Sequence, residues 1–565
     1  MRPELPDLVP AALRREWARR GDYPDLDIYT LFRGWAAVCP DRVAVVDDHG
    51  STSYARLDLL VRQTASGLLA LEIEPGDVVA VQLPNGLAAV TCELAIAAVG
   101  AVALPVPVGR GKDEVAALLR RSGTAMIIAA AHHRGRFPAT VAEELREGLP
   151  DLRRVVAVGE DENLALATVA SASQRDRPEL PRVDPDAAAR ILVSSGSEAE
   201  PKMVAYSHNA LAGGRGNFMA ELCHDDQVLR AMFLVPLASA FGSNATSVTL
   251  ARLGGTLVLS RHFQAEETLE LITAHRPTHL LGVPTMVRML LAAGQQHPVA
   301  PPDSAESPGE SEPVPLSPPA LPSLTALVLG GSPLDAATVH AARQAFDCPV
   351  VNLYGSADGV NCHTGLAGDP LDTSGPGVAA GKPNPRVADI RIVDFDHNEV
   401  PAGQTGEIIA RGPMTPMCYV GAPDLDARYR TTGGWVRTGD VGVLTAGGEL
   451  RVVGRLKDVV IRGGANISPT EVEEHIRSYP GVSDAVCFGV ADPLMGERLA
   501  AALVVAPDHC PTVEQLGSHL ARAGLDAYKH PEHVVAVQQL PLTPAGKVDK
   551  DALRAQLPET APTDT

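Results

Sequence analysis

Hydrophobic residues in the first 260 positions fall into two alternating patterns. Short runs rich in β-branched residues, such as 77–83, are followed by longer segments rich in alanine and leucine, such as 87–99, and then by another short run at 101–105. Short apolar runs bounded by turn residues are typical of buried strands, and the longer segments are typical of helices. The alternation predicts βαβ units and a largely parallel sheet.

The same pattern continues beyond these first units. Further buried strands are expected at 155–158, 191–193, 255–259, 279–281 and 326–329. We therefore expect an α/β fold in which a large N-terminal domain, residues 1–455, has several layers built on parallel, β-rich sheets.

After Gly381 the pattern changes to short strands of the hairpin type. Strands are expected at 388–394, 406–411 and 449–454, the last of them directly after the turn residues Ala446-Gly447-Gly448. This change predicts a β-rich subdomain over about 383–455.

The last part of the chain has a third pattern, in the order helix, strand, strand, helix. A helix is expected at 469–478, with strands at 485–490 and 500–505. Residues 456–557 are therefore predicted to form a small α+β C-terminal domain, and residues 558–565 a disordered tail.

A proline-rich segment interrupts the globular pattern between residues 298 and 322. Nine of its 25 residues are proline, mixed with serine and glutamate. Such a composition cannot bury enough apolar surface to offset the entropy lost on ordering, so it predicts a flexible surface insertion. Two interpretations stay open: an inert loop, because long insertions have a low closure cost, and a segment that docks a partner.

Composition and charge narrow the function classes. The chain has 565 residues, of which 45% are apolar, and 48 basic against 68 acidic residues give a formal net charge of −20. At about 100 to 200 residues per domain, this length predicts about three to five packing units. The negative charge gives no overall attraction to nucleic acid phosphates or anionic lipids, so we expect no nucleic acid and no membrane as partner.

The cysteines and the N-terminus indicate a cytoplasmic protein. The eight cysteines form no Cys-x-x-Cys pair, so we expect reduced and mostly buried thiols. The first residues lack the basic and then apolar layout of a signal peptide, and the longest apolar stretch, 87–108, is interrupted by Glu93 and two prolines.

The loop between residues 191 and 208 carries the first candidate chemistry. A strand runs into small residues, Ser194-Ser195-Gly196-Ser197, and the loop ends at Lys202. Small side chains let backbone N–H groups surround an anion, and the lysine adds a positive charge for phosphate. No Walker A frame fits this loop. The structural alternative is a serine-rich turn before a helix capped by Ser207.

Further motifs follow the loop in a particular order. They are Gly330-Gly331-Ser332-Pro333, Asn352-Leu353-Tyr354-Gly355-Ser356-Ala357-Asp358, Thr438-Gly439-Asp440, Gly454-Arg455-Leu456-Lys457-Asp458, the segment Arg462 to Glu473, and Pro544-Ala545-Gly546-Lys547. With the loop, this ordered set resembles the superfamily of acyl-adenylate-forming (AMP-binding) enzymes: acyl- and aryl-CoA ligases, adenylation domains of peptide synthetases, and firefly luciferase. The resemblance covers residues from about 25 to 557.

The resemblance implies a reaction and a set of nucleotide contacts. The family couples a carboxylate to AMP with release of pyrophosphate and then passes the acyl group to a thiol. By resemblance, Lys202 contacts the ATP phosphates, Tyr354 stacks on adenine near the Gly330-Gly331 turn, and Asp358 holds Mg²⁺. Asp440 accepts from the ribose hydroxyls, with Arg455 as a second contact to ribose or phosphate. The full expected nucleotide set is Ser194, Ser195, Gly196, Ser197, Gly330, Gly331, Tyr354, Gly355, Asp440 and Arg455.

The resemblance also implies a mobile C-terminal domain. Lys547 matches the lysine that bridges the substrate carboxylate and the α-phosphate, which makes it the first candidate for the catalytic residue, beside Lys202 and Arg455. Lys457 matches the hinge about which the domain rotates between the two half-reactions. The rotation would remove Lys547 and bring in the segment 462–467. For each of these residues a purely structural role remains the alternative.

Three positions depart from the usual pattern of the family. Glu198 replaces a threonine and Ala199 a glycine in the phosphate loop, and Glu200 fills its variable position. Like charges about 4 Å apart repel by about 4 kcal/mol at an effective dielectric of about 20, so both carboxylates are expected to point outward or to share the metal. Ala357 replaces the common threonine, as in the aryl-acid adenylating members.

The acyl pocket is expected around the segment 232–242. No acidic residue lies between Arg230 and Gly242, so a free α-ammonium group would have no charge partner and an ordinary α-amino acid is disfavoured. Ser239 stands where aryl-CoA ligases often have histidine. The expected pocket residues are His208, Leu234, Ser239, Phe241, Asn361 and Cys362. His208 could instead be a hydrogen-bonded residue at a helix start, and Asn361 and Cys362 could pack against a helix.

These observations favour a free-standing ATP-dependent ligase for an aryl or small cyclic acid. The expected cofactors are ATP and Mg²⁺, and the acceptor is the thiol of CoA or of the phosphopantetheine arm of a separate carrier protein. Two rivals stay open. One is a catalytically idle adenylate-binding or regulatory protein, motivated by Glu198, Ala199 and Ala357; the other is an acyl-AMP ligase with an amine acceptor.

Overall fold

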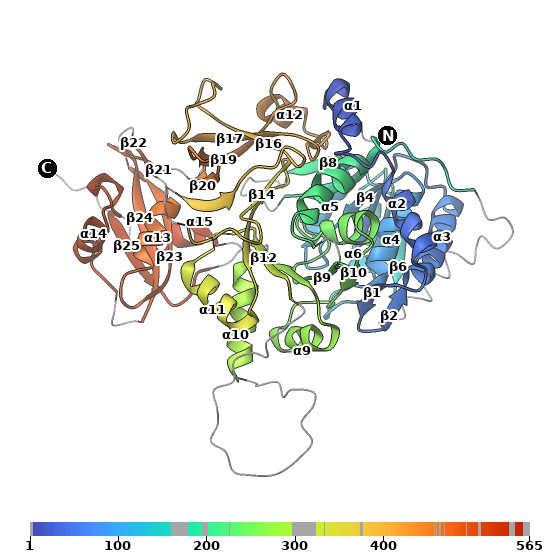
Figure 1. Cartoon of the computed structure of the whole chain (residues 1–565), viewed down its shortest axis with the longest axis horizontal. Coiled ribbons are helices and arrows are strands. Elements are labelled where there is room, and N and C mark those ends of the chain that lie inside the picture. The colour runs from blue at the N-terminus through green and yellow to red at the C-terminus, as the bar shows by residue number, and fades with distance from the viewer. Residues whose placement is uncertain are drawn as a thin grey trace, which may run out of the picture. The chain divides into compact units, whose positions relative to one another are not determined.

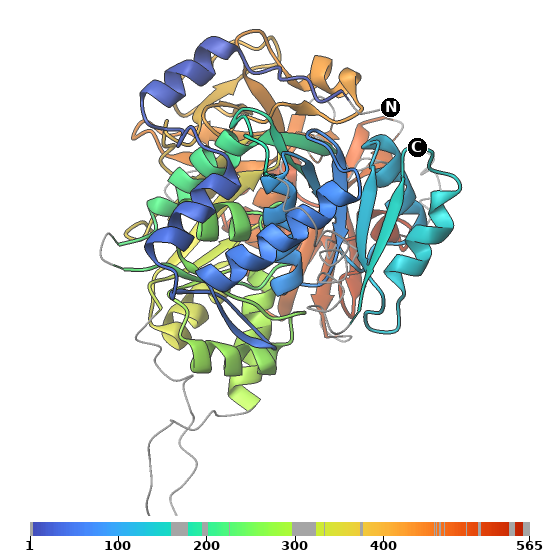
Figure 2. The same ribbon diagram turned by 90° about the vertical axis from the view of Figure 1, so that its right-hand side faces the viewer.

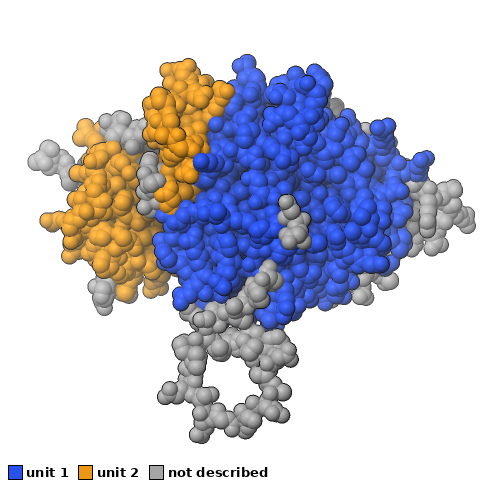
Figure 3. All heavy atoms as spheres, viewed as in Figure 1, with its two compact units in different colours: residues 1–371, 380–390, 409–438 blue, residues 372–379, 391–408, 439–565 orange. Residues whose placement is uncertain are grey.

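A computed structural model describes most of the chain. The described residues are 4–159, 179–194, 202–224, 227–296, 324–332, 334–372, 377–456, 458, 460–462, 465–467, 469–492, 494–506, 510–541 and 548–557. They fall into two compact units, unit 1 with residues 1–371, 380–390 and 409–438, and unit 2 with residues 372–379, 391–408 and 439–565 (Figure 3). The predicted insertion 298–322 and the predicted tail 558–565 lie outside the described residues.

An eight-stranded sheet forms one layer of unit 1 (Figure 1). Its strands are β1 (Val43–Asp47), β2 (Gly50–Ser53), β9 (Arg230–Phe233), β10 (Thr256–Val258), β11 (His279–Gly282), β12 (Ala326–Gly330), β13 (Val350–Ser356) and β14 (Val360–His363). Their order is β14-β13-β12-β11-β9-β10-β1-β2, parallel from β13 to β1 and antiparallel at the two edges. The strands predicted at 255–259, 279–281 and 326–329 are confirmed.

A seven-stranded sheet forms a second layer of unit 1. Its strands are β3 (Val78–Gln82), β4 (Val102–Pro105), β5 (Met126–Ala130), β6 (Arg154–Val158), β7 (Ala188–Val193), β8 (Met203–Ser207) and β18 (Cys418–Tyr419). Their order is β18-β8-β7-β4-β3-β5-β6, with β7 to β6 parallel and β8 and β18 antiparallel to their neighbours. The parallel sheets predicted from the βαβ pattern are therefore present.

The helices of unit 1 connect and cover these sheets (Figures 1 and 2). They are α1 (Ala11–Arg19), α2 (Ile28–Val38), α3 (Tyr54–Ala70), α4 (Leu87–Ala98), α5 (Lys112–Arg121), α6 (Pro138–Arg146), α8 (Arg215–Ala220), α9 (Ala265–His275), α10 (Pro284–Gln296), α11 (Ala336–Phe346), α12 (Pro423–Tyr429) and the π-helical segments η1 (Ala210–Gly214) and η2 (Ala245–Arg252). The helix α4 contacts β1 of the first sheet and β3 and β4 of the second, so it lies between the two. It is apolar on nearly every side because it is buried on both faces.

Unit 2 contains most of a five-stranded sheet. The strands are β15 (Val378–Gly381), β16 (Asp389–Val393), β17 (Gly406–Arg411), β19 (Val436–Leu444) and β20 (Leu450–Arg455), in the order β15-β20-β19-β17-β16. The strands predicted at 388–394, 406–411 and 449–454 are confirmed.

The last part of unit 2 has the predicted α+β order. Its elements are β21 (Val460–Arg462), β22 (Ala465–Ile467), α13 (Pro469–Ile476), β23 (Val482–Asp492), β24 (Gly496–Val505), α14 (Val513–Arg522), η3 (Ala527–Lys529), β25 (His533–Val537) and α15 (Lys550–Arg554). A core of buried aliphatic residues, including Val472, Leu503 and Leu516, joins its helices to its sheet. The domain boundary at 455 stays a prediction.

Two further expectations concern the whole chain. All eight cysteines are free, and five of them, Cys92, Cys348, Cys362, Cys418 and Cys487, are buried, as predicted. Among the described residues, no helix is both long enough and apolar enough to cross a bilayer.

Candidate active site

Lys202 stands at the end of the loop that the sequence predicts to bind phosphate. The Ser194 N–H donates to the Lys202 carbonyl at 2.8 Å, and the Lys202 N–H donates to Ser194 Oγ at 3.2 Å. These bonds close a β-hairpin between β7 and β8. Ser207 caps the helical segment that follows it, because its Oγ accepts the Ala210 N–H at 3.2 Å where η1 begins. It is the last residue of β8 and so does not belong to the loop. The loop interior, including Ser195, Gly196, Ser197, Glu198, Ala199 and Glu200, lies outside the described residues.

Asp358 lies in the turn between β13 and β14. Ser356 Oγ donates to Asp358 Oδ2 at 2.8 Å and accepts the Asp358 N–H at 3.1 Å, so the turn itself orients the carboxylate. Gly359 follows with a φ of +104°, and a Cβ at this position would lie 2.5 Å from Pro416 Cδ. The turn therefore requires glycine next to the carboxylate.

Lys202 and Asp358 belong to different sheets, and the fold brings them together. Lys202 Nζ lies 3.9 Å from Asp358 Oδ1, and the two side chains are only 12% and 9% exposed. The hydroxyl of Tyr419, from the edge strand β18, donates to the same Oδ1 at 2.6 Å. A cation suited to phosphate and a carboxylate suited to a hard metal ion are therefore neighbours.

Two tyrosines that the sequence analysis did not identify surround the Lys202 ammonium. Nζ lies 3.6 Å from the centroid of the Tyr429 ring and 5.6 Å from that of Tyr419. The two ring centroids are 5.9 Å apart. A signal existed, because two of only nine tyrosines in the chain stand ten positions apart, shortly before Thr438-Gly439-Asp440.

Burial keeps the nearby phenols protonated. Burial, with the neighbouring Asp358 carboxylate, raises the pKa of Tyr419 far above its ordinary value. Burial also raises the pKa of Tyr206 to about 12, and its hydroxyl donates to the Ala357 carbonyl at 2.8 Å. Both phenols are therefore hydrogen-bond donors at neutral pH and hold the turn that carries Asp358.

The donor set around Asp358 fits Mg²⁺ bound together with phosphate. Each carboxylate oxygen of Asp358 accepts one hydroxyl, from Tyr419 or Ser356, which leaves lone pairs for a metal ion. In the part of the chain that the structure describes, no group of three or more His, Cys, Asp or Glu side chains could hold a metal by itself. Mg²⁺ commonly binds through one or two carboxylates and the oxygens of a phosphate substrate, so the arrangement fits this ion.

The residues expected around adenine come from the ends of two neighbouring strands. Gly330 in β12 pairs with Leu353 in β13, directly before Tyr354 and Gly355. Gly331 has a φ of +83°, which glycine adopts without strain. The structure therefore brings the Gly330-Gly331 turn beside Tyr354 at the carboxyl end of a parallel sheet, where ligands of α/β proteins bind.

Three of the residues expected around the acyl group, Leu234, Ser239 and Phe241, lie in the segment that follows β9. The Leu234 N–H donates to the Leu281 carbonyl at 2.9 Å, and Ser239 Oγ accepts the Gly242 N–H at 2.9 Å. Phe241 contacts Phe233 edge to face, with ring centroids 6.3 Å apart.

Asn361 and Cys362 belong to β14, which contacts α8, and Cys362 pairs with Tyr354 across the two strands. Burial raises the pKa of the Cys362 thiol to about 12, so this thiol is protonated and unreactive at neutral pH.

His208 is a buried histidine at a helix start. Its Nδ1 accepts the Ile28 N–H at 3.3 Å, and burial lowers its pKa to about 4, so the ring is neutral. Its Nε2 has no hydrogen-bond partner among the described residues. The hydrogen-bonded alternative is therefore confirmed, whereas a contact with substrate stays a prediction.

Three buried polar side chains fix the segment 234–243. Arg190 donates to Glu93 Oε2 and to the Leu237 carbonyl, both at 2.7 Å. Asn85 Oδ1 accepts the Leu237 N–H at 2.9 Å, and Arg215 donates to the Ala240 carbonyl at 2.9 Å. The sequence analysis did not identify these residues, because none of them stands in a motif and all three lie outside the segment in the sequence.

Within unit 2, Asp440 and Arg455 face each other on adjacent strands. They are register partners of β19 and β20, and Arg455 Nε lies 3.2 Å from Asp440 Oδ1. The Gly439 N–H donates to Glu407 Oε1 at 3.2 Å, which fixes the backbone of β19 directly before Asp440. Lys547 and Lys457 lie outside the described residues.

A charged network lies in the C-terminal part of unit 2. Arg462 and Arg498 share Glu532 Oε1, at 2.6 and 3.0 Å, and Arg498 also pairs with Asp492 at 2.5 Å. Asp492 therefore has structural partners.

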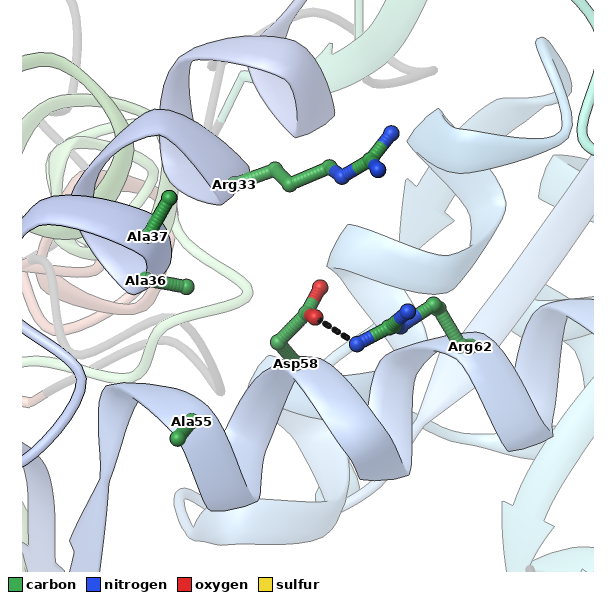
Figure 4. Close-up of a pocket in the computed structure, with 6 residues that line it drawn as sticks. All are labelled: Arg33, Ala36, Ala37, Ala55, Asp58 and Arg62. Carbon is green, nitrogen blue, oxygen red and sulfur yellow. Dashed lines mark hydrogen bonds and ion pairs between the residues drawn. The ribbon is translucent and has the colours of Figure 1, made fainter.

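A small hollow lies apart from the candidate site, between α2 and α3 (Figure 4). It has a volume of about 240 Å³ and is lined by Arg33, Ala36, Ala37, Ala55, Asp58 and Arg62. Asp58 pairs with Arg62 and accepts the Tyr29 hydroxyl at 3.0 Å. None of the predicted site residues lines this hollow.

Comparisons with known proteins give a family and several relatives. The family described as AMP-binding enzyme matches residues 32–420, and the AMP-binding enzyme C-terminal domain matches residues 471–547. Triostin synthetase I of Streptomyces triostinicus is 34% identical over 550 residues, covering 97% of this chain and 97% of its own length.

Two further relatives cover nearly the whole chain. The salicyl-AMP ligase / salicyl-S-ArCP synthetase of Mycobacterium tuberculosis is 30% identical over 561 residues, covering 97% of this chain and 94% of its own. The solved structure of the amide bond synthetase McbA from Marinactinospora thermotolerans has a TM-score of 0.75 at 28% identity, covering 94% of this chain and 99% of that one.

Proposed function

Because the chain belongs to the AMP-binding enzyme family, we propose that it activates an aryl or other small cyclic carboxylic acid. The chain is an AMP-forming acid–thiol ligase, which uses ATP to convert a carboxylic acid into an acyl-AMP with release of pyrophosphate and then transfers the acyl group to a thiol. The single observation that carries the assignment of the site is the pairing of Lys202 with Asp358 at 3.9 Å.

The chemistry of the first step needs this pairing. Attack of a carboxylate on a triphosphate brings like charges together, so cations and donors must offset the repulsion and the charge that develops on phosphorus. Lys202 would bind phosphate oxygens, and Asp358 would hold Mg²⁺, which neutralises phosphate charge when bound. The buried hydroxyls of Tyr419 and Ser356 orient the carboxylate for this role.

The other nucleotide contacts are part of the same proposal. Tyr354, Gly330 and Gly331 would contact adenine, since they meet at the ends of β12 and β13. Asp440 would accept the ribose hydroxyls, because its carboxylate is already oriented by Arg455. A cytoplasmic location, where ATP is plentiful, stays a prediction.

Two features support an aryl or cyclic acid. The segment 234–243 contributes Phe241 and Ser239 and no acidic side chain, so a free α-ammonium group would find no counter-ion there. Ala357 replaces the threonine that is common in the family, as an alanine does in the aryl-acid adenylating members. The Tyr206 hydroxyl donates to the Ala357 carbonyl. The name of the mycobacterial relative, which is 30% identical to this chain, points to the same class of acid.

The catalytic lysine and the hinge complete the proposal. Lys547 would bridge the substrate carboxylate and the α-phosphate during adenylation. Rotation about Lys457 would then exchange Lys547 for the segment 462–467, which opens the site to a thiol. The C-terminal family match, residues 471–547, ends at this lysine.

The experiment that tests the proposal traps the intermediate and offers it different acceptors. The protein is incubated with MgATP and salicylate, and the acyl-AMP is identified by mass spectrometry. CoA, a phosphopantetheinylated aryl carrier protein and a simple amine are then added separately. We expect a thioester with one of the two thiols. An amide alone would refute the thiol step and favour the amine acceptor. The amine is a necessary control because the chain is similar to an amide bond synthetase.

A further inference from the structure

We propose that Tyr429 and Tyr419 are positioning residues that keep Lys202 and Asp358 apart and oriented for the triphosphate and its metal ion. This inference rests on the proposed adenylation. It concerns two residues that no motif of the sequence analysis includes, one at the end of α12 and one in β18.

Among the residues that the structure describes, the Tyr429 ring lies nearest to the Lys202 ammonium. Nζ lies 3.6 Å from the ring centroid, closer than the 3.9 Å that separates it from Asp358 Oδ1. A lysine that is only 12% exposed has lost much of its hydration. The electron-rich face of an aromatic ring offsets this loss most effectively where water is excluded. The ring therefore fixes the direction in which the ammonium points.

The Tyr419 hydroxyl controls the other member of the pair. It occupies Asp358 Oδ1 at 2.6 Å, the same oxygen that faces Lys202. At 3.9 Å the lysine and this oxygen attract each other but form no hydrogen bond. Without the hydroxyl, the carboxylate and the ammonium could close into a direct hydrogen-bonded ion pair, and both groups would be less available to Mg²⁺ and phosphate.

The two tyrosines are held in one rigid segment. The Tyr419 N–H donates to Asp426 Oδ1 at 3.0 Å, and Asp426 pairs with Arg430 at 2.8 Å. Arg430 donates to the Pro416 carbonyl at 2.8 Å, which ties the residue after α12 to the residues before β18. The backbone next to both tyrosines is therefore held by contacts separate from those to Lys202 and Asp358.

The first test removes the Tyr429 ring. In Tyr429→Leu we expect the dissociation constant for MgATP, measured by isothermal titration calorimetry, and the KM for MgATP in pyrophosphate exchange to rise about tenfold, as for loss of a desolvated cation–π contact. The KM for the acid should change less than twofold. Tyr429→Phe keeps the ring and should retain most of the MgATP affinity that Tyr429→Leu loses. If Tyr429→Leu unfolds, Tyr429→Met, whose unbranched side chain is longer, takes its place and should show the same rise.

The second test removes the Tyr419 hydroxyl. Tyr419→Phe should raise the Mg²⁺ concentration for half-maximal pyrophosphate exchange several-fold, because Asp358 then pairs directly with Lys202. Tyr29→Phe is the matched control, since the Tyr29 hydroxyl also donates to a buried aspartate, Asp58, at 3.0 Å, away from the site. That control should keep the Mg²⁺ dependence of the wild type.

The outcomes separate this inference from the proposed function. If the wild type shows no pyrophosphate exchange with any acid, the proposed function fails. If the wild type exchanges and Tyr429→Leu binds MgATP as tightly as Tyr429→Phe, the positioning role of the ring is refuted. An unchanged Mg²⁺ requirement in Tyr419→Phe refutes the role of the hydroxyl.

Discussion

Lys202 and Asp358 show how single residues prepare the site for a highly charged ligand. At about 4 Å and an effective dielectric of about 20, two opposite charges attract by about 4 kcal/mol. Each group is therefore the counter-ion of the other, which explains why both charges tolerate burial. In the proposed site, a metal ion would replace the lysine at the carboxylate and phosphate would replace the carboxylate at the ammonium.

His208 gives a residue-scale prediction on the pH dependence of stability. Burial lowers its pKa to about 4, against about 6.5 in an unfolded chain. Below pH 6.5 the unfolded state binds the proton and the folded state does not, so stability is fully present above pH 6.5 and falls towards pH 4. Between pH 6.5 and 5 the loss should be about 2 kcal/mol.

Urea unfolding followed by tryptophan fluorescence measures this loss, because Trp17, Trp35 and Trp435 all belong to unit 1, as does His208. His208→Gln should lose about 2 kcal/mol less than the wild type over the same pH interval. The control, His340→Gln, removes an exposed histidine and should follow the wild type. Equal pH dependence in His208→Gln and the wild type would contradict the account.

At the scale of elements, the segment 234–243 depends on buried side chains from elsewhere in unit 1. Arg190 in β7 reaches the Leu237 carbonyl while it pairs with Glu93 in α4, and Arg190 and Glu93 are 4% and 7% exposed. Arginine performs both tasks because its planar fork presents several donors at fixed angles. The proposed acyl pocket would thus depend on a buried ion pair between β7 and α4.

Arg190→Lys tests this dependence. Lysine keeps the charge for Glu93 but cannot reproduce the fork, so the segment should loosen. We expect the KM for the acid to rise several-fold while the KM for MgATP stays within twofold. Arg451→Lys is the matched control, because Arg451 is also buried and also donates to backbone carbonyls, but in unit 2. An equal rise of both KM values in Arg190→Lys would show general destabilisation instead.

Local sequence patterns predicted single helices and strands better than they predicted which elements lie side by side. The run 326–329 identified β12, and the apolar helix 87–99 corresponds to α4. Lys202 and Asp358 were identified because each stands in a local motif. Tyr419 was not, because the pairing of β18 with β8 joins positions more than 200 residues apart, so its spacing from Tyr429 does not reveal that both lie beside Lys202.

At the scale of the whole molecule, the two family matches divide the proposed chemistry. The first, residues 32–420, contains Lys202 and Asp358, and the second, residues 471–547, ends at Lys547. If one lysine serves only the first half-reaction, its loss should separate the two steps. The chain has a net charge of −20, so an acidic carrier protein could dock only on a local basic surface of this chain.

Lys547→Ala is the corresponding prediction. Adenylation should fall by several orders of magnitude, because the bridge between carboxylate and α-phosphate is lost, while transfer from supplied acyl-AMP to the thiol should be largely retained. Single-turnover assays of each step measure the two rates separately. Equal losses in both steps would argue against alternation of the C-terminal domain.

The most direct test of the central claim is ATP–pyrophosphate exchange with Mg²⁺ across a panel of aryl, cyclic, aliphatic and α-amino acids. The account predicts exchange with aryl or small cyclic acids and little or none with α-amino acids. Measurable ATP binding without exchange for any acid would contradict it and would favour an idle adenylate-binding protein. Exchange confined to α-amino acids would contradict the proposed pocket while leaving the adenylation chemistry intact.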